Sequence, residues 1–568
     1  MAKGIMYVNG QRVAFDGEKN VLSVIRKTGI EMPTFCYYSD LSVYGACRMC
    51  VVEDERTGKI DASCSMEPRD GLRIRTNTAR LLKYRRVILE LMLASHNCDC
   101  TSCSKSGSCH LQDLAMQFGV HGRMGFKDSR DPTEIDDTSP AILRDPSKCI
   151  LCGDCVRACS ETIGMGIIDF AHRGYNMRVT PAFDRKMNET KCISCGQCSA
   201  VCPTGAIAVK NQIGDAWRAI HDPKKRTVVQ IAPAVRVAVG EAFGLNPGDN
   251  AMDMMVTALK LMGVDEVYDT TFAADFTTIE ESNEFLKRLE KGGPFPMFTS
   301  CCPAWVKYLE NENPKYVKHI STCKSPMEMF AAILKDQYKA KDAEDGKETY
   351  HIAIMPCTAK KMEAARPEFQ HDGKPDVDLV LTTYELIKMI KESGIKLTEL
   401  ELESTDLPFG LGSGSGVIYG TTGGVAESVV RYCLPDKSKN VLRELSYSPL
   451  RGNEGIREAA ITVGEKEIKL AVVHGLANAK ELLKRIDAGE AYYDLVEVMT
   501  CPGGCVGGAG QPHGLMPAKR ERAEGLYNID RSAPFKRAER NPVVKSFMDA
   551  YGPEKCHELL HVHYPDAK

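Results

Sequence analysis

The sequence lacks the features of exported and membrane-spanning proteins. Its start has no basic stretch followed by an apolar run and a small-residue cleavage site, and it contains no 18 consecutive apolar residues. A strong net charge is absent too. Because 73 Lys and Arg face 76 Asp and Glu, no overall field attracts nucleic acid or an anionic membrane. We therefore expect a soluble, cytoplasmic protein with neither nucleic-acid nor membrane partners.

Disulfide bonds are also expected to be absent, although the chain contains 24 cysteines. The cytosol keeps thiols reduced, so cysteines at this density in an unexported chain indicate metal thiolates. A chain of 568 residues is too long for one hydrophobic core and predicts roughly three to five domains. The spacing of the cysteines divides it into four.

The first group of cysteines lies in residues 1–80, after two short β-like runs and a helical segment at Val21–Ile25. A close Cys-x2-Cys pair and Gly45 allow three thiolates to converge from one loop while a fourth arrives from the next segment, as an iron–sulfur rhomb requires. Zinc is the alternative, although its sites usually pair two Cys-x-x-Cys knuckles. The layout is similar to a plant-type 2Fe-2S ferredoxin domain, with candidate ligands Cys36, Cys47, Cys50 and Cys64.

A second group, in residues 81–126, combines one histidine with three cysteines in the spacing His-x3-Cys-x2-Cys-x5-Cys, after a basic helical stretch at 79–90. One imidazole and three thiolates can hold a 4Fe-4S cluster, and imidazole in place of thiolate removes a negative charge and raises the reduction potential. A lone histidine is more often a core or surface residue, but the flanking cysteines favour a ligand. The candidates are His96, Cys100, Cys103 and Cys109, with Cys98 as a bystander.

An internal repeat in residues 127–209 gives the strongest local signal. The spacing Cys-x2-Cys-x2-Cys-x3-Cys occurs twice, and in this arrangement each run gives three thiolates to one 4Fe-4S cluster and its fourth to the other. A pair of structural zinc ions is the weaker alternative. The predicted ligand sets are Cys149, Cys152, Cys155 with Cys202, and Cys192, Cys195, Cys198 with Cys159.

Beyond Val209 the cysteines become sparse, and β-like apolar runs alternate with amphipathic segments, which predicts α/β lobes with mostly parallel sheets. Three motifs, at 299–303, 355–361 and 499–512, set a cysteine beside Pro or Gly, where the backbone can approach an inorganic cluster closely. The expected fold is multidomain α+β and α/β, with ferredoxin-like iron–sulfur domains before a two-lobed α/β domain in residues 210–568.

In the first motif two adjacent thiols, Cys301 and Cys302, precede a proline. Neighbouring side chains diverge, so if one thiolate ligates a metal, the other is left as a titratable group at the edge of the site. Two buried cysteines acting as small hydrophobes are the alternative. The glycine-rich stretch 410–416 fails the G-x-G-x-x-G spacing and lacks a P-loop lysine, so we interpret it as a close-packing turn.

The three motifs, preceded by the ferredoxin-like cysteine sets, resemble the FeFe hydrogenases of the monomeric clostridial type essentially from end to end. The resemblance implies reversible reduction of protons to dihydrogen at an H-cluster. This cofactor joins a 4Fe-4S cube through one cysteine sulfur to a two-iron centre with carbonyl, cyanide and azadithiolate. The implied cube ligands are Cys302, Cys357, Cys501 and Cys505, with Cys505 as the bridge.

The same resemblance implies roles around the two-iron centre. Lys360 would pair with one cyanide, which suits its positive charge and three donors. Met355 and Met499 would pack against the two-iron centre and exclude water, although ordinary core packing predicts the same burial. Pro233 and Ala234 would lie near the other cyanide, where some relatives carry a serine in place of the alanine.

Glu281, Glu284 and Arg288 fall at i, i+3 and i+7 of a helix predicted to begin near Thr278, so they share one face. The pattern alone favours a solvated face, because Thr278-x-x-Glu281 fits a capping box and Glu284 can pair with Arg288. The resemblance instead implies a proton path, which runs from surface Arg288 through Glu284, Ser321 and Glu281 to Cys301 as the final proton donor and acceptor.

The resemblance also implies cofactors and partners. These are one 2Fe-2S cluster, three accessory 4Fe-4S clusters and the H-cluster, with a soluble ferredoxin or flavodoxin as electron partner, maturation proteins, and a monomeric chain. One alternative is a non-catalytic iron–sulfur assembly protein, which should lose the Cys301 or Lys360 position. Another is an iron–sulfur subunit of a respiratory NADH dehydrogenase, which shares only the first 210 residues or so.

Two alanines near the motifs and the C-terminal tail need separate mention. Ala304 and Ala509 stand where glycine is commoner in the resembling family. The tail Cys556–His563 has three histidines at a spacing compatible with zinc. Because no fourth ligand is evident beyond Cys556 itself, we predict a surface helix end there.

Overall fold

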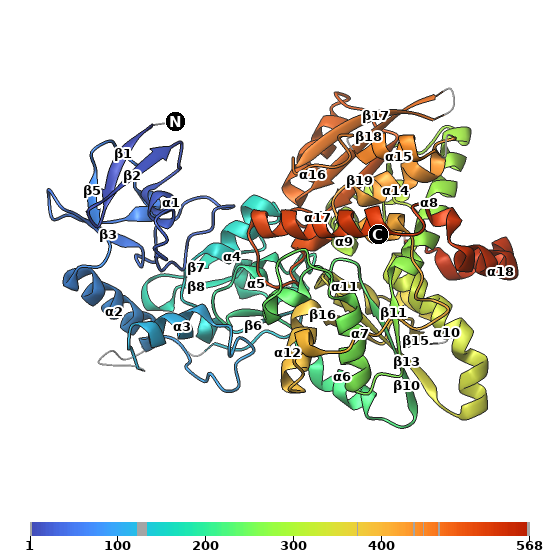
Figure 1. The fold of residues 1–568 in the computed structure, drawn as a ribbon, viewed down its shortest axis with the longest axis horizontal. Helices are drawn as coiled ribbons and strands as arrows, with labels where there is room; N and C mark the ends of the chain where they lie inside the picture. Colours follow the sequence, from blue (N-terminus) through green and yellow to red (C-terminus); the bar gives the residue numbers. More distant parts are fainter. Residues whose placement is uncertain are drawn as a thin grey trace.

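The computed structural model describes residues 3–121, 133–371, 373–435, 438–446, 448–463 and 466–564. Figure 1 shows a small sheet domain at one end, a middle region of short helices and hairpins, and a larger two-lobed α/β region at the other end. This arrangement confirms the expected multidomain α+β and α/β class. The predicted boundary between residues 126 and 127 lies outside the described residues.

The first domain is a five-stranded mixed sheet in the order β2-β1-β5-β3-β4. Its first hairpin turns at Asn9–Gly10, where both residues have positive φ, as a two-residue turn matched to the twist of the strands requires. Helix α1 packs its apolar face against the sheet. The bounds are β1 Lys3–Val8, β2 Gln11–Asp16, α1 Val21–Arg26, β3 Val51–Asp54, β4 Ile60–Ala62 and β5 Arg73–Arg75.

A long helix, α2 (Ala79–Ala94), leads from this sheet into the middle region. Its buried Arg85 donates hydrogen bonds to three carbonyl oxygens of the first domain, at 3.0 Å to Met49, 2.8 Å to Val51 and 2.9 Å to Thr76. This side chain therefore ties the helix to the sheet. The other elements of the region are α3 His110–Gln117, β6 Ile142–Arg144, α4 Asp154–Arg157, β7 Ile168–Ala171, β8 Arg178–Pro181, α5 Gln197–Ala200 and β9 Ile207–Val209.

One lobe of the α/β region is built on a four-stranded sheet that is parallel throughout, in the order β11-β10-β13-β16. Helices pack against the sheet, and the apolar residues of its strands belong to one buried core with them. The bounds are α6 Ile213–Ile220, β10 Lys225–Ile231, α7 Met252–Leu261, β11 Glu266–Asp269, α10 Pro326–Asp345, β13 Glu348–Met355, α11 Ala359–Ala364, β16 Leu379–Thr382 and α12 Thr383–Glu392.

The other lobe has a sheet in the order β12-β19-β18-β17, in which the first three strands are parallel and β17 is antiparallel. Helix α17 crosses between the two lobes in Figure 1. The bounds are β12 Met297–Phe298, α9 Pro303–Glu312, α13 Gly414–Ile418, α14 Gly424–Cys433, α15 Lys439–Ser446, β17 Ile456–Val463, β18 Lys466–His474, α16 Leu476–Asp487, β19 Leu495–Met499, α17 Met516–Ser532 and α18 Pro542–Leu560; a short hairpin, β14 Gln370–His371 with β15 Lys374–Pro375, lies outside both sheets.

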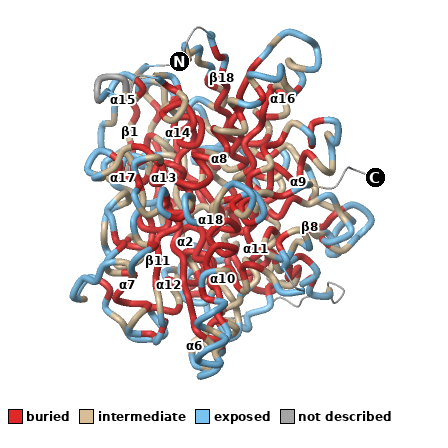
Figure 2. Tube along the Cα trace, turned by 90° about the vertical axis from the view of Figure 1, so that its right-hand side faces the viewer, coloured by how far each residue is buried: buried red, intermediate tan, exposed pale blue. Residues whose placement is uncertain are grey.

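Helix α8 (Thr271–Lys291) begins about two turns before Thr278. The predicted start near Thr278 is therefore wrong. Thr278 is buried inside the helix, where its hydroxyl donates to the Ala274 carbonyl at 2.8 Å and cannot cap the first turn. The preceding residues continue the helix because Phe272 and Phe276 bury their rings in the core. The same burial runs through the centre of the α/β region in Figure 2.

The glycine-rich stretch 410–416 is closely packed, as predicted. A Cβ at Gly412 would lie 2.0 Å from the Thr271 hydroxyl, and one at Gly416 would lie 2.4 Å from the Thr271 carbonyl oxygen. The stretch is not only a turn, however, because the short helix α13 begins at Gly414. Among the helices of the described ranges, none is both long enough and apolar enough to cross a membrane.

Candidate active site

A cavity lies where parallel strands of both lobes end. The segments that follow β10 and β13 line it from one lobe, and those that follow β12 and β19 line it from the other. The carboxyl ends of parallel strands are the usual place for a ligand site in α/β sheets. All three cysteine motifs therefore meet at one point, although they are far apart in the sequence.

The residues expected around the H-cluster are all brought to this cavity. The lining includes Pro233, Ala234, Cys301, Cys302, Met355, Cys357, Lys360, Met499, Cys501 and Cys505. Met355 and Met499 are each 2% exposed, which fits both a role beside a cofactor and ordinary core packing.

The thiols of this cavity suit an iron–sulfur cluster. Removal from water raises the pKa of Cys357 to about 11, and it raises the pKa of Cys501 and Cys505 further, with the neighbouring thiols adding to the effect. Free thiols here would be neutral, whereas a bound metal takes its thiol ligands as thiolates. Several such thiols facing one cavity are therefore better suited to a metal cluster than to a packed apolar core.

The glycines of the third motif let its loop fit closely against the second motif. A Cβ at Gly508 would lie 2.1 Å from the Pro356 carbonyl oxygen, and one at Gly510 would lie 2.9 Å from the Pro356 carbonyl carbon. Side chains at these positions would push Cys505 away from Cys357. The glycines thus allow two cysteine motifs from different lobes to face the same cavity.

Lys360 has a partner that the sequence analysis missed. Its Nζ donates to Glu363 Oε2 at 2.6 Å and to the Cys301 carbonyl oxygen at 3.3 Å. Burial opposes the charged amine, but Glu363 outweighs it and raises the pKa of Lys360. Ser325 in turn donates to Glu363 at 3.0 Å. A signal was present in the sequence, because Glu363 lies three residues after Lys360 on one helix.

Three residues of the predicted proton path are in contact, and the other two are buried close to them. Arg288 pairs with Glu284, and Ser321 Oγ donates to Glu284 Oε2 at 3.0 Å. Glu281 is fully buried and accepts from the Ser300 amide at 3.4 Å, next to Cys301. Arg288 was predicted to lie at the surface, but it is only 9% exposed, and this prediction is wrong. Its guanidinium donates to the His319 and Ile320 carbonyls.

Two groups of this series have strongly altered acidity. Burial raises the pKa of Glu281 to about 8, the negative charge of Glu284 adds to the rise, and hydrogen bonds from Ser321 and Ser300 oppose it. Burial likewise raises the pKa of the Cys301 thiol, with the charge of Glu281 as the next cause. Both groups therefore hold protons at neutral pH, inside the protein and beside the cavity.

The first cysteine set lies at the edge of the N-terminal sheet. The Cys47 amide donates to Cys36 Sγ at 3.3 Å and the Phe35 amide donates to Cys47 Sγ at 3.4 Å, while the Cys50 and Cys64 thiols interact with each other. All four candidates are buried. The loop thus gathers the four predicted thiols and provides amide donors to two of them, as an iron–sulfur centre prefers.

The histidine-containing set lies between α2 and α3. Cys103 interacts with both Cys100 and Cys109. His96, which precedes these cysteines in the sequence, is buried. Cys98 is exposed and donates weakly to the His96 carbonyl at 3.4 Å, in agreement with its interpretation as a bystander. A Cβ at Gly205 would lie 2.6 Å from Cys103 Sγ, so this set adjoins the next one.

The thiols of the repeated motifs lie close together. One cavity is lined by Cys149, Cys152, Cys155 and Cys202, so the last cysteine of the second run joins the first three of the first run. Cys198 interacts with Cys159 and Cys192 and also with Cys202. The division into two ligand sets stays a prediction.

The second run, Cys192 to Cys202, lies against the loops that line the cavity. Cys195 interacts with Cys501, and Gln197 donates from Nε2 to the Gly507 carbonyl at 3.0 Å. Thr358 of the second catalytic motif donates to the Ser194 carbonyl at 2.9 Å. No feature of the sequence indicates these contacts, which join residues 164 and 310 positions apart.

The C-terminal tail contains the predicted helix end, with His557 and His563 exposed. The other face of the helix end, with Cys556, Leu559 and Leu560, is buried. The helix end packs there because the residues after it pair with the segment 322–324 through a β-bridge between His561 and Cys323. The predicted alternative of a zinc site on Cys556 is not assembled, since Cys556 belongs to an apolar cluster.

Comparisons with known families cover most of the chain. Residues 225–509 match the family described as the C-terminal domain of the iron-only hydrogenase large subunit, and residues 517–567 match the iron hydrogenase small subunit. Residues 5–79 match a 2Fe-2S cluster binding domain and 148–206 a 4Fe-4S dicluster domain. Residues 85–123 match an iron–sulfur binding region of NADH-ubiquinone oxidoreductase G.

Similar proteins extend over the whole length. A subunit of the NADP-reducing hydrogenase of Solidesulfovibrio fructosivorans is 39% identical, and 98% of each chain is covered. Iron hydrogenase 1 of Clostridium pasteurianum is 33% identical over 98% of this chain and 99% of its own. The solved apo form of an [FeFe]-hydrogenase from Chlamydomonas reinhardtii is 38% identical with a TM-score of 0.55, and it covers 63% of this chain and 100% of its own.

Proposed function

The chain belongs to the iron-only hydrogenase family, and on this premise we propose that it reversibly reduces protons to dihydrogen with electrons from a reduced ferredoxin. It is an oxidoreductase with iron–sulfur clusters. The observation that carries the proposal is the cavity between the lobes, which brings the thiols of three motifs together with Lys360.

Four cysteines of this cavity would hold the cube of the H-cluster, namely Cys302, Cys357, Cys501 and Cys505. The two-iron centre would supply the redox chemistry when bound. Lys360, whose charge Glu363 holds in place, would orient one cyanide, and the Pro233–Ala234 backbone would face the other. Met355 and Met499 would keep water out of the cavity.

The four cysteine sets would form an electron relay. The domains that carry them span residues 1–80, 81–126 and 127–209, before the catalytic domain 210–568. One 2Fe-2S and three 4Fe-4S clusters would lead to the cavity, with the His96-ligated cluster at higher potential than an all-cysteine one. The electrostatic interaction of Cys195 with Cys501, and the hydrogen bond from Gln197 to Gly507, support the last step of the relay.

The proton route would start at Arg288 and pass through Glu284, Ser321 and Glu281 to Cys301. The contacts among the first three and the burial of the last two support this order. The Cys301 thiol would donate its proton into the cavity, and Glu281 would then reprotonate the resulting thiolate and recover its own proton through Ser321 and Glu284. A solvated face is a poorer account of these residues, because Glu281 is fully buried.

Two candidates arise for the electron partner. A soluble ferredoxin or flavodoxin would dock at the 2Fe-2S or the histidine-containing domain of a monomeric, cytoplasmic chain. The similarity to a subunit of an NADP-reducing hydrogenase favours a second candidate, in which partner subunits exchange electrons between this chain and NADP. Electron transfer from ferredoxin to the isolated chain distinguishes the two, because the second candidate requires the partner subunits.

Infrared spectroscopy of protein produced with the H-cluster maturation proteins tests the central proposal. We expect carbonyl and cyanide stretches together with dihydrogen production. Protein produced without the maturation proteins should show iron–sulfur signals and no turnover. If matured protein lacked these stretches, a non-catalytic iron–sulfur assembly role would become the better interpretation.

A further inference from the structure

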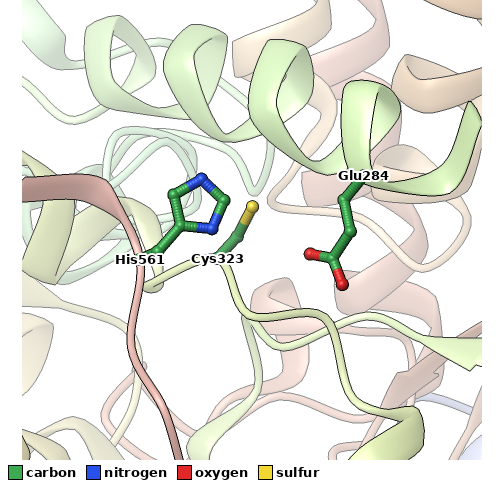
Figure 3. A group of neighbouring side chains, drawn as sticks. All are labelled: Glu284, Cys323 and His561. Carbon is green, nitrogen blue, oxygen red and sulfur yellow. The ribbon is translucent and has the colours of Figure 1, made fainter. Parts of the chain in front are cut away.

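Three potential metal ligands meet beside the outer part of the proposed proton path. Glu284 comes from α8, Cys323 from the segment before α10, and His561 from the end of α18. One ligand atom of each lies within 4.8 Å of the other two. Figure 3 shows the imidazole, the thiol and the carboxylate approaching one another from these separate elements.

Backbone hydrogen bonds hold two of the three donors in position. Cys323 and His561 face each other in an isolated β-bridge. On either side of it the Lys324 amide donates to the Leu560 carbonyl at 2.8 Å, and the Val562 amide donates to the Thr322 carbonyl at 2.7 Å. The imidazole and the thiol are therefore largely preorganised, which lowers the entropic cost of binding an ion between them.

The imidazole of His561 is oriented as in many metal sites. Its Nε2 lies 3.2 Å from Glu280 Oε2, and its Nδ1 lies 2.8 Å from the Thr322 hydroxyl. An Nε2–H donated to Glu280 leaves the lone pair on Nδ1. The Thr322 hydroxyl now lies between this nitrogen and Glu284 Oε2, 3.0 Å from the latter, and would turn away when an ion binds there. Metal-binding histidines usually donate their other ring N–H to a carboxylate in this way.

The donor set defines the class of cation. Carboxylate, imidazole and thiolate together are typical ligands of a borderline-soft divalent ion such as Zn²⁺. Ionised Glu284 and a Cys323 thiolate would balance its charge, and water would complete a tetrahedron. Ligand atoms in such a site lie roughly 3.3–3.8 Å apart, so side-chain shifts of about 1 Å would close this one.

We propose that Glu284, Cys323 and His561 form a binding site for a divalent transition-metal ion such as Zn²⁺. The ion would bind to the carboxylate of Glu284, which accepts hydrogen bonds from both Ser321 and Arg288. Bound Zn²⁺ would therefore interrupt proton transfer and inhibit turnover in both directions. This inhibition rests on the proton path proposed above, whereas the site itself does not.

Zinc binding is measured directly by equilibrium dialysis of ⁶⁵Zn²⁺ against the holoenzyme. We expect one tight Zn²⁺ per chain, with affinity lowered at least about tenfold in Cys323→Ser and in His561→Gln, and roughly tenfold in Glu280→Gln. His563→Gln, in the same tail, and Cys433→Ser, a thiol in α14, are matched controls that should bind like wild type. Visible absorbance of the iron–sulfur clusters should stay constant during the titration.

The possible outcomes separate the two proposals. Equal zinc affinity in wild type, Cys323→Ser and His561→Gln would overturn the site. Loss of binding in both variants, with reversible inhibition of wild type that EDTA relieves, would support both proposals. Site-specific binding with unchanged turnover would support the metal site and would count against Glu284 as part of the proton path.

Discussion

Gln197 donates from Nε2 to the carbonyl oxygen of Gly507 at 3.0 Å, so the last iron–sulfur motif before the catalytic domain is hydrogen-bonded to the loop that carries Cys505. The same side chain also interacts with Cys501. The contact thus joins two cofactor sites that the chain builds separately, and it lies where electrons would enter the catalytic cavity.

Replacing Gln197 with Leu should lower the reduction potential of the catalytic cube. A hydrogen bond to a ligand sulfur stabilises the reduced cluster, and its loss is worth roughly 20–60 mV for one electron. An EPR-monitored redox titration measures the shift. Gln117→Leu, at an exposed position on α3, should leave the potential unchanged, and an equal potential in Gln197→Leu would show that the contact is only structural.

Deleting residues 1 to about 205 should separate hydrogen turnover in the cavity from electron transfer through the N-terminal clusters. Turnover with a small artificial donor should persist, because the catalytic cavity is built from residues after 231, while exchange with ferredoxin should fall at least about tenfold. A related solved chain that covers only 63% of this one supports the folding of such a fragment. Equal loss with both donors would mean that the N-terminal clusters are structural.

Glu281→Gln should lower turnover by roughly 10²–10⁴-fold, since it keeps the shape of the side chain and removes its transferable proton. The pKa of Glu281 is raised to about 8, so the wild-type carboxyl is protonated below that pH and loses its proton as the pH rises through it. Hydrogen production should decline over the same range. Infrared difference spectra should show a carboxylic acid band that titrates near pH 8 and is missing in the variant.

Glu284→Gln offers a second check of the same route. It should also reduce turnover, because Glu284 joins Arg288 to Ser321. Near wild-type activity in both glutamine variants would restore the solvated-face interpretation of this helix.

Cys301→Ser should keep iron content and carbonyl bands but lose most turnover in both directions, by roughly 10²–10⁴-fold. Serine is nearly isosteric with cysteine but a much weaker acid, and Cys301→Asp should recover part of the activity. Cys302→Ser should lose the cube instead. If Cys301→Ser lost the cube and Cys302→Ser kept it, the two roles would be reversed; full activity in Cys301→Ser would remove the proton role.

Glu363→Gln should destabilise the catalytic domain by roughly 3–5 kcal/mol, because it leaves the buried Lys360 without its ionised partner. Thermal unfolding of protein made without the maturation proteins measures the effect apart from the H-cluster. The control is Glu368→Gln, which weakens a more exposed pair with Arg366 and should cost less than about 1 kcal/mol. Equal midpoints in the two variants would contradict a structural role for the Lys360–Glu363 pair.

The sequence by itself indicated the iron–sulfur domains and the buried strands. Spacing such as that of Cys149 to Cys159 dictates how many thiols one loop can present, and this is a local property. Runs rich in β-branched apolar residues, such as Val228, Val229 and Ile231 within 227–231, predicted buried strands for the same reason. The three catalytic motifs could therefore be recognised before any contact between them was known.

Only the tertiary structure decided how these local units meet. The sequence pattern at Thr278 fitted a helix cap, yet the apolar residues before it extend the helix into the core, because tertiary burial outweighs a local capping preference. Likewise, no local sequence pattern indicates that Gln197 donates to Gly507. None indicates that His561 lies beside Cys323 and Glu284. Such contacts depend on the packing of distant elements, so they follow from the folded arrangement and not from spacing along the chain.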